Sequence, residues 1–113
     1  WSPCTSPGCG RRPQVHGTEV SFRLGPGTLD EAREIADRLA AAARGCRRHV
    51  LFVDAAAGEY GCLAEWDRKE DAAAFAARPE ARAALAALEA RTGRPPRVRM
   101  YAMEVAETPR GGG

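Results

Sequence analysis

The sequence predicts a single α+β domain with the element order β-α-β-β-α-β. The length of 113 residues suits one domain. Four segments alternate or run apolar in the manner of strands, and two regions repeat apolar residues at helical spacing. The second and third strands are separated only by residues 56–58, which predicts an antiparallel hairpin. This order is the ferredoxin-like split arrangement, an antiparallel four-stranded sheet with helices on one face.

The first half of the domain contains one strand and one amphipathic helix. Residues 19–24 alternate, with Val20 and Phe22 on one face, and a Gly-Pro-Gly run ends that strand. Thr28 and Glu31 have the spacing of a capping box, so we expect Thr28 to cap the helix that follows. Apolar residues continue at helical spacing to residue 43, and Gly45 ends the helix.

The second half of the domain is organised around the stretch 58–75. Residues 49–55 and 60–66 form the predicted hairpin, and its second strand ends in a tryptophan, Trp66. Asp67 is expected to cap a helix over residues 67–77, with Glu70 completing a capping box. Pro79 interrupts this helix and starts another through residue 91, and residues 97–107 form the last strand. We expect the exit of the third strand to place Trp66 above the mouth of a cavity.

Composition excludes several classes of function. The net charge of +2 comes from 17 basic and 15 acidic residues without a basic stripe, so nucleic-acid binding is not expected. No apolar run approaches the ~20 residues of a membrane span, and a cytoplasmic location is expected. Cys4 and Cys9 are compatible with a metal knuckle or a small disulfide loop, but Cys46 and Cys62 form no second close pair. Four free thiols and no metal are therefore expected. Residues 1–17 and 108–113 are predicted to be flexible tails around a domain at 18–107.

The sheet is expected to need a second copy of the chain. Apolar residues make up 44% of the sequence, but many of them are alanine and only 6% of the chain is aromatic. Helices cover one face of the predicted sheet, and the strands carry apolar residues on the other face as well. A homodimer with sheet against sheet is the simplest way to cover that face.

At the third strand and the helix after it, the sequence resembles a known family. The run YGCLAEWDRKEDAAAFAARPEARAALAAL and the later strand RVRMYAMEV resemble the antibiotic biosynthesis monooxygenase domain, which belongs to the dimeric α+β barrels. The most specific elements are Trp66, Asp67, Glu70 and Phe75 at matching spacing. The resemblance implies a homodimer with a pocket between sheet and helices in each subunit. It also implies oxidation of polyketide-type phenols by molecular oxygen without flavin, haem or metal, with Trp66 lining the pocket. A haem-degrading branch uses a histidine on the helix after the tryptophan, and residues 67–91 contain none.

The sequence departs from the quinone-forming members, which carry polar groups near the tryptophan where this chain has Cys62 and Ala72. Two classes of function therefore stay open: a cofactor-independent oxygenase acting on an aromatic or polyketide-like substrate, and a barrel that binds ligands, resembles polyketide cyclases or is a structural partner. An ionisable residue in the pocket of Trp66 would favour the oxygenase. Catalytic candidates are Trp66, His49, Tyr101 and Arg99, and the expected pocket residues are Phe22, Tyr60, Cys62, Phe75 and Met100. Several of these residues also have a purely structural interpretation. His49 would be a solvated residue, Arg99 a surface charge, Tyr60 and Tyr101 packing aromatics, and Cys62 a small core residue.

Overall fold

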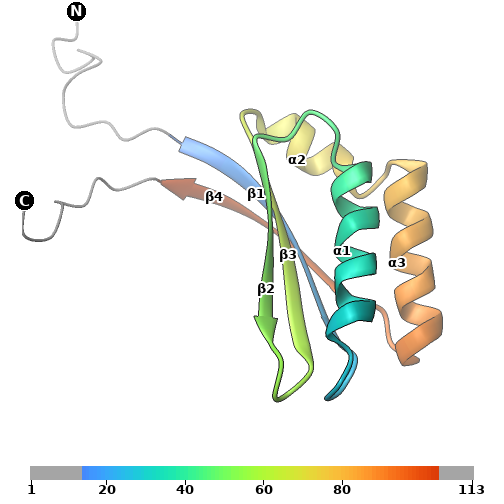
Figure 1. Ribbon diagram of the computed structural model, residues 1–113. Helices are drawn as coiled ribbons and strands as arrows, with labels where there is room; N and C mark the ends of the chain where they lie inside the picture. Colours follow the sequence, from blue (N-terminus) through green and yellow to red (C-terminus); the bar gives the residue numbers. More distant parts are fainter. Residues whose placement is uncertain (1–13, 105–113) are drawn as a thin grey trace, which may run out of the picture.

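The fold is an antiparallel four-stranded sheet with its helices on one face, as predicted. The computed structural model describes residues 14–104. The elements in chain order are β1 (Gln14–Arg23), α1 (Leu29–Ala42), β2 (Arg48–Asp54), β3 (Glu59–Trp66), α2 (Lys69–Phe75), α3 (Pro79–Thr92) and β4 (Arg97–Glu104). The strands lie in the order β2-β3-β1-β4, and all neighbours are antiparallel. Figure 1 shows α1 and α3 side by side on one side of the sheet, with α2 near the end of β3.

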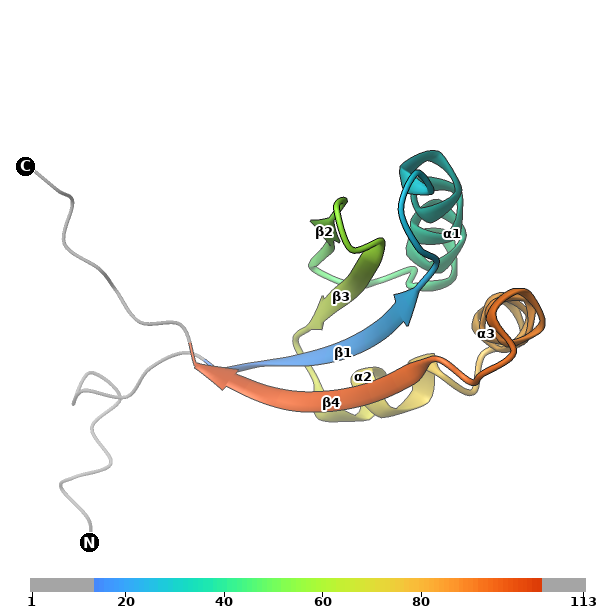
Figure 2. The same ribbon diagram turned by 90° about the horizontal axis from the view of Figure 1, so that it is seen from below.

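The sheet divides its side chains into two faces. On the helix face, Val20 on β1 and Cys62 on β3 point toward the helices and are 1% exposed. The opposite side, called the open face below, carries the alternate residues and is covered by no helix in Figure 2. Phe52 on β2 belongs to this open face and is 47% exposed. Within the described residues, therefore, the sheet has one covered face and one uncovered face.

The first strand begins earlier than predicted. It starts at Gln14 rather than at residue 19, so His16 and Gly17 lie in the sheet and not in a tail. The glycine and the polar residues of this segment hide the alternation in the sequence, and pairing with both β3 and β4 stabilises it as a strand.

The described helices are all shorter than a membrane span requires.

Both predicted capping boxes are wrong. Thr28 does precede α1, but its hydroxyl donates to the carbonyl oxygen of Gly25 at 2.6 Å and caps nothing. The helix α2 starts at Lys69, after Arg68, and the carboxylate of Asp67 instead forms an ion pair with Arg47 at 3.4 Å. The Thr28 hydroxyl is also hydrogen-bonded to the Tyr60 hydroxyl at 2.9 Å. In each case, residues outside the helix engage the side chain that local spacing would assign to the helix end.

The break at Pro79 is confirmed. Pro79 is the first residue of α3, and the residue before it has extended backbone with ψ of 140°. Gly93 ends α3 in the left-handed conformation at φ 79°, which glycine adopts without steric cost. The element order is therefore β-α-β-β-α-α-β. The turn between α2 and α3 brings Arg78 back over the end of β3.

Candidate functional site: the surroundings of Trp66

Trp66 is buried in the layer between sheet and helices, whereas the sequence analysis placed it above the mouth of a cavity. It is the last residue of β3 and is 1% exposed. The ring of Phe75, at the end of α2, packs against the indole with the ring centroids 5.8 Å apart. The indole nitrogen Nε1 is buried and has no hydrogen-bond partner among residues 14–104. A buried donor without an acceptor costs about 1–3 kcal/mol, so this atom needs an explanation.

Arg78 also lies over the indole ring. Its guanidinium carbon lies 5.2 Å from the centroid of the Trp66 ring. One nitrogen of the same guanidinium, Nη1, donates to the carbonyl oxygens of Ala42 at 2.8 Å and Arg44 at 2.9 Å. These carbonyls lie at the end of α1, where the helix dipole favours a cation. Arg78 therefore holds a positive charge beside Trp66, a role that the sequence, in which Arg78 only precedes a proline, did not reveal.

His16 lies directly opposite Trp66 on the neighbouring strand. The register of β1 and β3 pairs these two residues, which places their Cβ atoms about 4.5–5.5 Å apart on the helix face. Thr18, on the same face, donates its hydroxyl to the carbonyl oxygen of Ala72 in α2 at 2.9 Å and anchors that helix over the site. Sequence reasoning missed His16. The period-two series His16, Thr18, Val20 and Phe22 was the signal that could have found it.

His49 lies near the same site on β2, which pairs with β3 along the edge opposite β1. It pairs with Ala64, so it is a diagonal neighbour of Trp66 on the helix face, at about 7–8 Å. Burial lowers the pKa of His49 below its ordinary value, and the nearby carboxylate of Asp37 opposes that shift. His16 and His49, the two histidines of the sequence, thus lie on the strands that flank Trp66.

Cys62 and Phe75 are core residues of this layer. Each is 1% exposed and belongs to the same apolar cluster as Trp66. Burial raises the pKa of the Cys62 thiol to about 12, so the sulfur stays protonated near neutral pH and is a poor nucleophile. Among the described residues, no group of three potential ligands is arranged to hold a metal ion.

Tyr101 and Arg99 lie on the open face, and the sheet separates them from Trp66. Tyr101 pairs with Gly17, and its hydroxyl donates to the carboxylate of Glu19 at 2.9 Å. That hydrogen bond raises the pKa of Tyr101 above its usual value, and Arg99 lies 5.3 Å from the ring centroid. Met100 points to the helix side of β4 but is 59% exposed. The structure therefore does not bring Tyr101 and Arg99 together with the predicted catalytic tryptophan.

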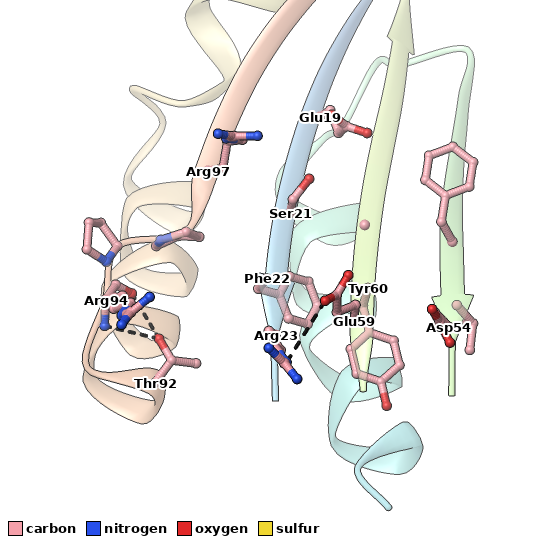
Figure 3. A pocket seen from close by; sticks show the side chains of 15 residues that line it. Glu19, Ser21, Phe22, Arg23, Asp54, Glu59, Tyr60, Thr92, Arg94 and Arg97 are labelled. Carbon is pink, nitrogen blue, oxygen red and sulfur yellow. Dashed lines mark hydrogen bonds and ion pairs between the residues drawn. The ribbon is translucent and has the colours of Figure 1, made fainter. Parts of the chain in front are cut away.

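Phe22 and Tyr60 lie at the opposite end of the strands from Trp66. Their ring centroids are 5.7 Å apart, and the Tyr60 hydroxyl shares a hydrogen bond of 2.9 Å with that of Thr28. They border a groove of about 810 Å³, called the end groove below, at the end of the sheet where β4 begins. Figure 3 shows its lining: Glu19, Ser21, Phe22, Arg23, Phe52, Val53, Asp54, Glu59, Tyr60, Gly61, Thr92, Arg94, Pro95, Pro96 and Arg97.

Solved structures share this arrangement of elements. A protein of Bordetella bronchiseptica assigned to the antibiotic biosynthesis monooxygenases aligns with a TM-score of 0.62 and 16% identity, over 81% of this chain and 98% of that one. The cofactor-independent oxygenase SnoaB of Streptomyces nogalater aligns with a TM-score of 0.61 and 19% identity, over 85% and 96%. The chain has the fold of the antibiotic biosynthesis monooxygenases. The resemblance predicted from sequence is confirmed at the level of fold.

A third structure of this monooxygenase fold, from Chloroflexus aurantiacus, aligns with a TM-score of 0.57 and 19% identity, over 87% of this chain and 99% of that one. No family model matches the sequence, and no curated protein is significantly similar to it. The likeness is therefore one of architecture, and chemistry has to be argued from the residues around Trp66.

The lowered pKa of His49 predicts how stability responds to acid. The unfolded chain protonates this imidazole near pH 6.5, and the folded chain does so only at lower pH. The contribution of His49 to the free energy of unfolding is thus fully present above pH 6.5 and is lost as the pH falls through the folded pKa. We expect His49→Gln to flatten the pH dependence of urea unfolding below pH 6.5. An unchanged dependence in the variant would show that His49 is not desolvated by folding.

Proposed function

We propose that the protein is a cofactor-independent monooxygenase that oxidises an aromatic or polyketide-like small molecule with molecular oxygen. The observation that carries this proposal is the polar surroundings of Trp66: His16 opposite it, His49 diagonal to it and Arg78 over its ring. A site lined only by alanine, valine, leucine and methionine would have argued against an oxygenase. The shared architecture with SnoaB, described as a cofactor-independent oxygenase, supports the same function.

The residues around Trp66 suit oxidation of a phenol. A phenol that has lost its proton can reduce oxygen itself, so the protein has to accept that proton and favour the anion. His16 is the proposed proton acceptor, and the positive charge of Arg78 favours the phenolate. The indole Nε1–H, which lacks an acceptor among the described residues, would donate to an oxygen of the substrate. One oxygen atom becomes the new carbonyl of the quinone, and the other leaves as water with the hydrogen of the oxidised ring carbon and the phenolic proton that His16 returns.

Substrate entry requires a local rearrangement. Trp66 is 1% exposed, and Phe75 of α2 packs against it. The helix α2 has only 7 residues and lies between the end of β3 and the break at Pro79. It is the element whose displacement would open the site with the least loss of packing, since α1 and α3 pack against each other.

The same burial of Trp66 favours a second candidate, a barrel without oxygenase chemistry. A tryptophan enclosed by Phe75 and an arginine is a sound core residue, and its ring contacts stabilise the fold without any ligand. In that case the protein binds a small molecule or a protein partner, and Trp66 contributes only packing. The cytoplasmic location expected from the sequence remains a prediction in either case.

Oxygen uptake distinguishes the two candidates. We expect the wild type to consume oxygen with at least one compound from a panel of hydroxyanthrones and naphthols, and Trp66→Phe to weaken that activity. His16→Gln should lower kcat by about 10²–10⁴, the usual contribution of a general base. Arg82→Gln, on the exposed side of α3, is the control and should behave as wild type. No uptake with any compound would favour the second candidate, and a fully active His16→Gln variant would remove His16 from the mechanism.

We also propose that two copies pair through their open faces. Phe52 and Val53 are both 47% exposed, but Phe52 points to the open face and Val53 to the helix side of the edge strand β2. A large aromatic left exposed in the sheet is typical of a surface that is covered by a partner. The mass of the protein in solution tests this pairing.

Phe52 and Val53 provide a matched pair of variants to test the pairing of two copies. In sedimentation at micromolar concentration, we expect the wild type to be a dimer. Phe52→Glu should be a monomer, since it places a charge in the interface, and Val53→Glu should remain a dimer. A monomeric wild type, or equal effects of the two substitutions, would contradict pairing through the open face.

A further inference from the structure

We propose that the end groove is a second ligand site, which binds a flat aromatic molecule through a carboxylate. The groove of about 810 Å³ lies within the size range of small-molecule sites, about 300–1,000 Å³. It does not overlap the surroundings of Trp66. Glu59, which lines the groove, and Trp66 are the first and last residues of β3, about 23 Å apart at 3.3 Å per residue.

The carboxylates of the groove have partners within the chain, whereas two of its arginines do not, so the groove favours an anion. Each of its three carboxylates has a partner. Glu19 accepts from the Tyr101 hydroxyl at 2.9 Å, Glu59 lies 4.0 Å from Arg23, and Asp54 accepts from the backbone N–H of Ala57 at 3.3 Å. Of its three arginines, Arg94 and Arg97 form no ion pair or side-chain hydrogen bond with any residue between 14 and 104. Two guanidinium groups therefore remain available for a carboxylate.

The two arginines are carried by a restrained segment. The Thr92 hydroxyl donates to the carbonyl oxygen of Leu88 at 3.0 Å, and the backbone N–H of Arg94 donates back to that hydroxyl at 3.3 Å. Pro95 and Pro96 then restrict the backbone up to Arg97, which is the first residue of β4 and pairs with Ser21. Figure 3 places Arg94 and Arg97 on the β4 side of the groove and Asp54 on the β2 side. A carboxylate is thus drawn to one side and repelled from the other.

Aromatic and apolar side chains make up most of the rest of the lining. Phe52 is 47% exposed on the open face, and the buried rings of Phe22 and Tyr60 border the groove. A planar ring stacked on Phe52 would bury apolar area while its carboxylate meets the arginines. If two copies pair through their open faces, the bound molecule would lie between the subunits. The groove itself belongs to one chain, so the site does not depend on that pairing or on the oxygenase proposal.

Titration with 2-naphthoate and with its neutral analogue 2-naphthamide tests the site. We expect saturable binding of 2-naphthoate to the wild type by calorimetry, and at least about tenfold weaker binding of the amide, since a charge-assisted hydrogen bond contributes about 1.5–3 kcal/mol. Arg94→Gln and Arg97→Gln should each weaken 2-naphthoate by about tenfold. Arg82→Gln, which lies outside the groove, and Trp66→Phe, at the other end of the sheet, should bind like the wild type.

Several results would overturn the site. These are the absence of saturable binding to the wild type, equal affinity for the amide, or full affinity in both Arg94→Gln and Arg97→Gln. Loss of binding in Trp66→Phe would place the ligand beside the tryptophan instead. Sedimentation of each variant, compared with the wild type, shows whether a loss of binding comes from a changed oligomeric state.

Discussion

The pairing of β1 with β3 is the constraint on which the rest of the structure depends. Its register places His16 opposite Trp66 at one end and Arg23 opposite Glu59 at the other. Because side chains alternate between faces, a slip of one residue would move His16 to the open face and turn Thr18 away from α2. Thr18 resists such a slip, since its buried hydroxyl is satisfied by the carbonyl oxygen of Ala72.

The same register sorts the polar residues into separate places. Trp66, His16 and His49 share the helix face near one end of the strands, and Arg78 joins them from the turn between α2 and α3. Glu19, Arg99 and Tyr101 form a cluster on the open face, and the end groove lies at the far end of β3. One small sheet thus presents a buried aromatic site and a charged groove that do not share residues. This separation allows each proposed site to be altered without touching the other.

The order of strands and helices could be predicted because it rests on local signals. Alternation and short apolar runs located the four strands, and Pro79 and Gly93 marked the bounds of α3. The helix starts could not be predicted in detail, because Thr28 and Asp67 are engaged by residues distant from the helix that each would cap. The surroundings of Trp66 were also out of reach. His16 is recognised only through its cross-strand partner, and Arg78 only through carbonyls that lie more than thirty residues earlier in the chain. Likewise, the alternation of β4 does not say which face of the sheet Tyr101 occupies. Only the register of β4 with β1 places Tyr101 on the open face.

The register of β1 and β3 predicts that the imidazole of His16 contacts the indole of Trp66, and the proposed chemistry depends on this contact. Nuclear Overhauser effects between the ring protons of His16 and those of Trp66 measure this contact directly, in a Trp1→Phe background that leaves a single indole. The register predicts a cross-peak between the His16 and Trp66 rings, and His16→Gln identifies it by its loss. A Trp66 indole with cross-peaks to Phe75 but none to His16 would contradict the account, because the tryptophan would then be a core residue without the proposed base beside it.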